Sequence, residues 1–285
     1  MDFRLFSVNF ITLSNKKRTI KGAKIMKQSF FRLAIFLLVG MLSVSSYAAS
    51  FTEAIAAYDM ESSVSGNLYD ASGHGYNSTG FGGTNIVSGL YGKALQFDGD
   101  DQLVIADSPA LRLGSTITLE ATFTITSRAS DWVRVLGKGN GTYRNYGLWY
   151  HPNLNYFLFQ MYGANGNLSA QVTTTVQLNT VYHMVGTYDG TTARLYLNGT
   201  QVATQTVTMT PYTSADPLTI GGADFHAKHI GLIDNAAVYN KVLSPSEITQ
   251  YSSGNIGATS TPVPEPSSLL LLAFGYGLYR KFFKN

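Results

Sequence analysis

Apolar and polar residues alternate with a period of two along the middle of the chain. Between residues 116 and 125, every second side chain is apolar, and threonines and Glu120 occupy the positions between. This is the period of a β-strand with one face buried and the other in water. Three further strand-like segments follow, at 132–136, 146–150 and 156–162. Consecutive short strands with Gly- and Asn-rich turns, and no amphipathic helices between them, predict two packed antiparallel sheets.

The clearest strand pattern lies in residues 181–203. An alternating run from Tyr182 to Tyr188 is broken at Asp189-Gly190, and a second run ends at Asn198-Gly199. Asn-Gly favours a tight turn that needs positive φ at both central residues. The segment is therefore predicted to be a meander of three antiparallel strands.

This meander resembles the centre of laminin-G-like domains in the concanavalin A-like jelly-roll family. The family pattern reads W-Y-H-V-V-x-T-Y-D-G and then L-Y-L-N-G, and Val181 stands here in place of the tryptophan. Other segments resemble the family's opening pattern and its last two strands, at 56–61, 68–75, 92–99, 217–222 and 229–239. The resemblance implies an all-β domain over residues 49–252, a two-sheet antiparallel jelly-roll sandwich. Ser244, Pro245 and Glu247 then predict the start of one short helix.

The beginning of the chain carries an export pattern. Lys27 and Arg32 precede an apolar run over 33–42, and Ser46 and Ala48 supply the small residues of a cleavage site. Residues 1–48 are predicted to be a signal peptide with an apolar helix. A start at Met26 would give this leader a more ordinary length, and we expect translation to begin there. An uncleaved anchor is the less favoured alternative, because the run is shorter than the roughly 20 residues that a membrane span needs.

The end of the chain resembles a PEP-CTERM sorting signal. Residues 253–262 are predicted to be a flexible linker. Residues 263–285 then combine a Pro-Glu-Pro triplet, a short apolar run and a basic end, with the key residues Pro264, Glu265, Pro266, Arg280 and Lys281. The resemblance implies processing by an exosortase in a Gram-negative bacterium that makes extracellular polysaccharide. The apolar run would be a short transmembrane helix that anchors the protein transiently in the inner membrane before it reaches the cell surface or the medium; a permanent span is the alternative.

Composition changes this picture in two respects. The chain has no cysteine, so an exported domain has to derive its stability from its core, with or without a bound ion. The whole sequence has a formal net charge of +3, but residues 49–262 hold nine Lys and Arg against fifteen Asp and Glu. A mildly acidic domain gives no reason to expect nucleic-acid binding.

Acidic residues are too sparse to predict a hydrolase. Glycoside hydrolysis usually takes two carboxyl groups about 5–9 Å apart, and related β-glucanases carry them as E-x-D-x-x-E on one strand. No such run exists here, Glu120 is solitary on its strand, and the acids at 98, 100 and 101 fit a Gly-rich turn. We therefore predict a non-catalytic protein that binds carbohydrate or extracellular matrix. A polysaccharide-degrading glycosidase or lyase and a protein-binding adhesin are the alternatives.

A structural calcium ion is a second expectation from the resemblance. In this family calcium commonly joins the opening segment to the closing one, and the matching acids are Asp59, Asp70 and Asp234. Calcium is bound by carboxylate and carbonyl oxygens, and Asp234 lies in an apolar strand where an unpaired carboxylate is costly. In the alternative interpretation, Asp59 caps a turn and Asp234 accepts backbone N–H groups.

A cluster of aromatic residues predicts the ligand site. Sugar rings stack on aromatic faces while polar side chains bind the hydroxyls, and the candidate residues are Arg144, Tyr146, Trp149 and Tyr150. Tyr146 and Tyr150 share one face of their strand and Trp149 lies on the other, so one of the two sets is expected to be core.

Overall fold

The structure, a computed structural model, describes residues 51, 53–61, 63–64, 67–79, 83–223 and 225–253. The predicted signal peptide, the sorting signal and all of the linker except Ser253 lie outside the described residues, so they stay predictions. Within the described part of the chain, no helix is long and apolar enough to cross a membrane.

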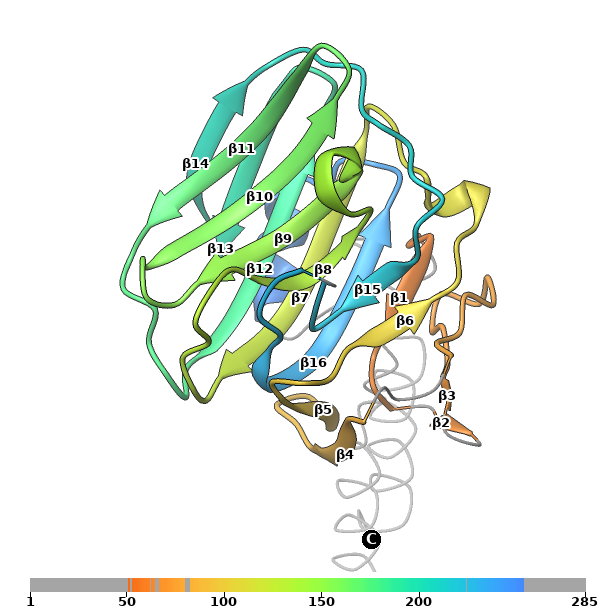
Figure 1. Ribbon diagram of the computed structural model, residues 1–285, viewed down its shortest axis with the longest axis vertical. Coiled ribbons are helices and arrows are strands. Elements are labelled where there is room, and N and C mark those ends of the chain that lie inside the picture. Colours follow the sequence, from red (N-terminus) through yellow and green to blue (C-terminus); the bar gives the residue numbers. More distant parts are fainter. Residues whose placement is uncertain are drawn as a thin grey trace, which may run out of the picture. The chain divides into compact units, whose positions relative to one another are not determined.

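Two antiparallel sheets pack face to face, with the six-stranded sheet in front in Figure 1. The eight-stranded sheet has the order β14-β13-β12-β7-β16-β5-β4, and β1 also pairs with β16. The six-stranded sheet has the order β11-β10-β9-β8-β15-β6. This arrangement confirms the predicted all-β sandwich.

The strand bounds follow the predicted segments closely. The eight-stranded sheet contains β1 (Ala56–Tyr58), β4 (Asn85–Ser88), β5 (Lys93–Asp98), β7 (Ile117–Ile125), β12 (Val181–Tyr188), β13 (Thr192–Leu197), β14 (Thr200–Thr206) and β16 (Ile230–Tyr239). The six-stranded sheet contains β6 (Leu103–Ile105), β8 (Val133–Lys138), β9 (Tyr146–His151), β10 (Tyr156–Gly163), β11 (Gly166–Thr173) and β15 (Leu218–Ile220). The remaining elements are the β2–β3 ladder (Ser63–Val64, Asn67–Leu68), the 3₁₀ turns η1 (Pro109–Leu111) and η2 (Gly141–Tyr143), and helix α2 (Pro245–Ser252).

The predicted meander is β12-β13-β14, and its second turn has the expected backbone. Asn198 and Gly199 have φ values of 49° and 77°, the positive φ at both central residues that the sequence predicts. Facing the other sheet, Gly186 of β12 accommodates Phe159 of β10, because a Cβ at Gly186 would lie 2.4 Å from the ring. The two sheets can therefore approach closely at this point.

The expectation that one face of residues 116–125 is in water is wrong. Glu120 of β7 is 1% exposed, because a second apolar cluster covers the outer face of the eight-stranded sheet. Its neighbours across the ladder, Val185 and Ala237, belong to this cluster together with Ile248 and Tyr251 of α2. Helix α2 has the predicted capping box, in which the Ser244 hydroxyl accepts from the Glu247 N–H.

Candidate functional site

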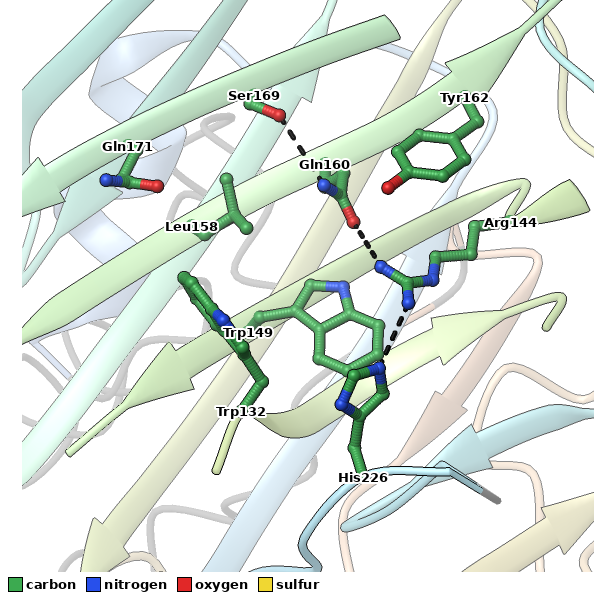
Figure 2. A pocket seen from close by; sticks show the side chains of 9 residues that line it. All are labelled: Trp132, Arg144, Trp149, Leu158, Gln160, Tyr162, Ser169, Gln171 and His226. Atoms are coloured by element: carbon green, nitrogen blue, oxygen red, sulfur yellow. Dashed lines mark hydrogen bonds between the residues drawn. The ribbon is translucent and has the colours of Figure 1, made fainter. Parts of the chain in front are cut away.

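A pocket of about 320 Å³ lies on the outer face of the six-stranded sheet. Its side chains come from β9, β10 and β11, from the residue before β8, and from the loops that precede β9 and β16 (Figure 2). They are Trp132, Arg144, Trp149, Leu158, Gln160, Tyr162, Ser169, Gln171 and His226. Concave sites of this size that combine apolar and polar groups are the usual form of a small-ligand site.

Strand alternation brings these side chains to one face. In β10 the core contains Phe157, Phe159 and Met161, so the residues between them, Leu158 and Gln160, point outward. The register places Leu158 opposite Trp149 and Gln160 opposite Ser169. The pocket floor therefore follows directly from the pairing of β9, β10 and β11.

Trp149 forms the floor of the pocket and is 2% exposed. A Cβ at Gly147 would lie 2.4 Å from the indole Nε1, so glycine there leaves room for the ring to lie along its own strand. The guanidinium carbons of Arg134 and Arg144 lie 4.6 Å and 5.0 Å from the ring centroid. Two cation–π contacts thus fix the indole beneath the polar side chains.

Arg144 lies at the centre of a hydrogen-bonded network (Figure 2). Its guanidinium donates to Gln160 Oε1 at 3.0 Å and to His226 Nε2 at 3.0 Å. Because a guanidinium can only donate, His226 Nε2 is the acceptor and its proton lies on Nδ1. That nitrogen donates to Asp131 Oδ2 at 3.1 Å. The pKa of Asp131 is lowered, chiefly by the backbone N–H of Trp132 and then by His226.

Aromatic side chains mark the edges of the pocket. Trp132 is half-buried and stacks on Tyr156 at a centroid distance of 6.0 Å and an interplanar angle of 9°. Tyr162 lies on the other side of Arg144, 5.4 Å from its guanidinium carbon. Unlike Trp149, Trp132 and Tyr162 both retain exposed surface.

Tyr146 and Tyr150 do not contribute to the pocket, which corrects the sequence-based expectation for both. Their side chains are 1% and 0% exposed and belong to the core between the sheets. The Tyr146 hydroxyl donates to the Leu111 carbonyl at 2.8 Å, and the Tyr150 hydroxyl bonds His229 Nδ1 at 3.0 Å. Burial raises the pKa of both hydroxyls. Of the four predicted ligand residues, Trp149 and Arg144 line the pocket.

Sequence reasoning missed most of the polar lining. Gln160, Ser169 and Gln171 are ordinary strand residues, but the alternation of β10 was a usable signal for Gln160. His226 had no such signal, because its position depends on how the loop between β15 and β16 folds back over Trp149. The ring centroids of His226 and Trp149 are 5.2 Å apart.

Asp70 already accepts hydrogen bonds from four donors. They are the backbone N–H groups of Ala57, Ser72 and Tyr76 and the Ser72 hydroxyl, at 2.6–3.1 Å. Three of these bonds go to Oδ1 and one, from Tyr76, goes to Oδ2. The carboxylate therefore links β1 to the Gly-rich loop through the protein's own donors.

Asp234 and Asp59 also accept hydrogen bonds within the protein. Asp234 Oδ2 accepts the N–H groups of Leu90 and Tyr91 at 2.6 Å and 3.1 Å, and Asp59 Oδ1 accepts the Glu61 N–H at 3.0 Å. Burial raises the pKa of Asp234, and the neighbouring Glu61 and Asp59 raise it further. These contacts match the hydrogen-bonding alternative for the acids.

The three predicted calcium ligands are not gathered around one point. Among the described residues, the acids that bring three ligand atoms within 4.8 Å of one another are Asp98, Asp100 and Asp101. Calcium also takes backbone carbonyl oxygens, so this arrangement leaves the prediction at Asp59, Asp70 and Asp234 untested. Calcium binding there stays a prediction, for which chelation is the test.

Sequence and structure comparisons agree on the fold. A sequence profile of the concanavalin A-like lectin/glucanases superfamily matches residues 97–249. No curated protein matches the chain.

Several solved structures have a similar fold at low sequence identity. Domain 4 of AbnA, an extracellular arabinanase from Geobacillus stearothermophilus solved with arabinotriose, has a TM-score of 0.57 and 17% identity; the match covers 70% of this chain and 98% of that domain. The binding domain of Paraclostridial Mosquitocidal Protein 1 has a TM-score of 0.57 and 13% identity over 70% of this chain, but only 52% of that domain is covered. The Trypanosoma rangeli sialidase has a TM-score of 0.56 and 21% identity over 74% of this chain and 35% of the sialidase. At these identities the similarity concerns the fold alone.

Proposed function

Because the chain belongs to the concanavalin A-like lectin/glucanases superfamily, we propose that it is an exported, non-catalytic carbohydrate-binding protein. The observation that carries this proposal is the pocket above Trp149, which combines partly exposed aromatic rings with polar side chains. Trp132 and Tyr162 keep exposed ring surface for contact with sugar rings, and Gln160, Ser169 and Gln171 offer groups for hydroxyls. A solved domain of the same fold forms a complex with arabinotriose, which agrees with this use of the fold.

The distribution of acids supports binding without catalysis. The nine described residues that line the pocket include no Asp or Glu, whereas glycoside hydrolysis usually takes two carboxyl groups across one cleft. Asp131 lies behind His226 and is bonded to it. Glu120 is buried on the other sheet, where it accepts from His183 Nε2 at 2.8 Å and from the Tyr239 hydroxyl at 3.0 Å.

The proposed destination follows from the patterns at the ends of the chain. Export through the signal peptide, transient anchoring in the inner membrane and processing by an exosortase would deliver the domain to the cell surface or into extracellular polysaccharide. Intact mass of the secreted protein tests this route, with a new end near Pro266 as the expected result. A secreted form that retains Arg280 and Lys281 would contradict it.

Retention of the full chain on polysaccharides and a glycan array tests the binding proposal. We expect Trp132→Ala and Tyr162→Ala to weaken retention by up to about tenfold, since an aromatic stacking contact contributes roughly 0.5–1.5 kcal/mol beyond the area that it buries. Tyr69→Ala is the matched control, because Tyr69 is 39% exposed and is not among the residues that line the pocket. Its retention should equal that of the wild type.

Three results would contradict the proposal. The first is a folded protein that is retained by no polysaccharide. The second is the release of reducing ends or unsaturated products, which would indicate the glycosidase or lyase alternative. The third is capture of protein partners without competition by sugars, which would indicate an adhesin.

A further inference from the structure

We infer that the pocket selects acidic saccharides, and that Arg144 binds the carboxylate of a uronic acid residue. This inference rests on the proposed carbohydrate-binding function and specifies the class of sugar. The pocket lining contains Arg144 but no Asp or Glu among the described residues.

Arg144 carries a positive charge that no described carboxylate neutralises. Some other cations of the domain form ion pairs, such as Arg112 and Lys138 with Asp107. Arg128 instead donates to the backbone carbonyls of Pro152 and Val176. Among the described residues, none brings a carboxylate within 4.0 Å of the Arg144 guanidinium. Its two hydrogen-bond acceptors, Gln160 Oε1 and His226 Nε2, are both neutral.

The same two bonds hold the guanidinium in a fixed orientation. They use two of its five N–H donors, and no further described residue accepts a hydrogen bond from it. The indole of Trp149 and the ring of Tyr162 flank the group at 5.0 Å and 5.4 Å. A fixed planar group with spare donors is suited to bind a carboxylate, because little side-chain entropy is lost on binding.

The surroundings of Arg144 favour an anion as well. Arg134, which is 1% exposed, places a second guanidinium carbon 4.6 Å from the centroid of the Trp149 ring. The one described acid that bonds into the network, Asp131, is separated from Arg144 by the neutral His226 ring. Because residues 49–262 carry more acids than bases, Arg144 is a local positive charge on an acidic domain.

A purely structural role is the competing explanation. Arg144 links the start of β9 to β10 and to the loop before β16, so it could serve only to brace the sheet. The two roles differ in their consequences. A brace affects stability and the binding of every sugar alike, whereas a carboxylate receptor discriminates acidic from neutral sugars.

Calorimetric titration of the full chain with matched sugars separates the two roles. The probes are oligosaccharides of galacturonic, glucuronic and mannuronic acid, each as the free acid and as the methyl ester, which keeps the shape but removes the charge. We expect at least one free acid to bind about tenfold tighter than its ester, as a charge-assisted hydrogen bond would provide. The preference should weaken as salt rises.

Substitutions then assign the preference to Arg144. Arg144→Gln should bring the affinities for acid and ester to within about twofold, while Arg144→Lys should keep a reduced preference for the acid. Arg194→Gln is the matched control on the other sheet and should leave the preference unchanged. The lysine variant keeps the test valid if the glutamine variant does not fold.

The negative results separate this inference from the proposed function. Equal affinity of the wild type for acids and esters, or binding of neutral sugars only, would overturn the inference and leave carbohydrate binding intact. A preference that survives in Arg144→Gln would also overturn it. Failure to bind any acidic or neutral saccharide would overturn both proposals.

Discussion

Gly147 and Trp149 are two residues apart on β9, and the pocket floor depends on both. The indole lies over Gly147, so a methyl group there would meet Nε1 at 2.4 Å. We expect Gly147→Ala to displace the ring and, with it, the cation–π contacts to Arg134 and Arg144. Overpacking of this kind costs about 1–3 kcal/mol, measurable as unfolding free energy in urea, and saccharide retention should fall in parallel.

Gly114→Ala is the matched control for that substitution. A Cβ at Gly114 would meet nothing within 4 Å, so stability and retention should match those of the wild type. If Gly147→Ala left both properties unchanged, the position of Trp149 would not depend on the space above Gly147.

The buried His229 side chain should make the free energy of unfolding depend on pH. The side chain lies between the sheets, and desolvation lowers its pKa from 6.5 to about 4. The unfolded chain therefore takes up a proton between pH 6.5 and pH 4 while the folded chain does not. The free energy of unfolding should fall by about 3 kcal/mol across that range as pH decreases.

A difference measurement isolates the contribution of His229. His229→Gln keeps groups that can bond the Tyr150 hydroxyl and the Leu232 carbonyl, which His229 contacts at 3.0 Å and 3.3 Å. Urea titrations between pH 4 and pH 8 should show a smaller slope in this variant, and His74→Gln, at an exposed position, should keep the wild-type slope. An unchanged slope in His229→Gln would contradict the prediction.

At single residues, the sequence could predict faces but not partners. Alternation separated Trp149 from Tyr146 and Tyr150, and the structure places these two sets on opposite sides of the sheet. The set that faces the second sheet becomes core, and the sequence of a single strand does not show on which side that sheet packs. The same limit concealed His226, whose bond to Arg144 spans 82 positions.

Among the elements, Asp234 joins β16 to the turn between β4 and β5. Its carboxylate accepts the N–H groups of Leu90 and Tyr91, and a Cβ at Gly89 would lie 2.5 Å from Oδ2. Asp234→Ala leaves two backbone donors without this acceptor. We expect it to lower the free energy of unfolding by roughly 2–4 kcal/mol, measured in urea.

Chelation shows whether calcium also contributes at this position. If the stabilising role of Asp234 comes from its hydrogen bonds alone, the melting temperature of the wild type should be the same in chelator and in excess calcium. The decrease in melting temperature caused by Asp234→Ala should then also be equal in both. A lower wild-type melting temperature in chelator, abolished by Asp234→Ala, would instead support the calcium prediction.

Elements were the most predictable level of this fold. The meander, the turn at Asn198-Gly199 and the capping box at Ser244 all depend on neighbours in sequence, and each is confirmed. The burial of Glu120 was not predictable in this way, because α2 and residues near Phe51 cover it from distant parts of the chain. Polar residues at alternate positions of a strand show that the strand has two different faces. They do not show that the polar face is exposed to water.

In the whole domain, the outer faces of the two sheets have different roles. On the eight-stranded sheet, α2 covers a buried network in which Glu120 bonds His183 and Tyr239. On the six-stranded sheet, the outer face carries the pocket. The core between the sheets separates these two regions, so stability and binding should respond to different substitutions.

Glu120→Ala tests this separation. Removal of the carboxylate leaves two buried donors without their acceptor, and we expect a loss of roughly 2–5 kcal/mol in the free energy of unfolding. Affinity for saccharide, measured by calorimetry at a temperature where the variant is folded, should equal that of the wild type. Tyr239→Phe, which removes one of the two donors and keeps the ring, should have a smaller effect on stability and none on affinity. A folded Glu120→Ala variant that no longer binds saccharide would show that the two faces are coupled, and the pocket could then not be treated as a site that the six-stranded sheet builds independently.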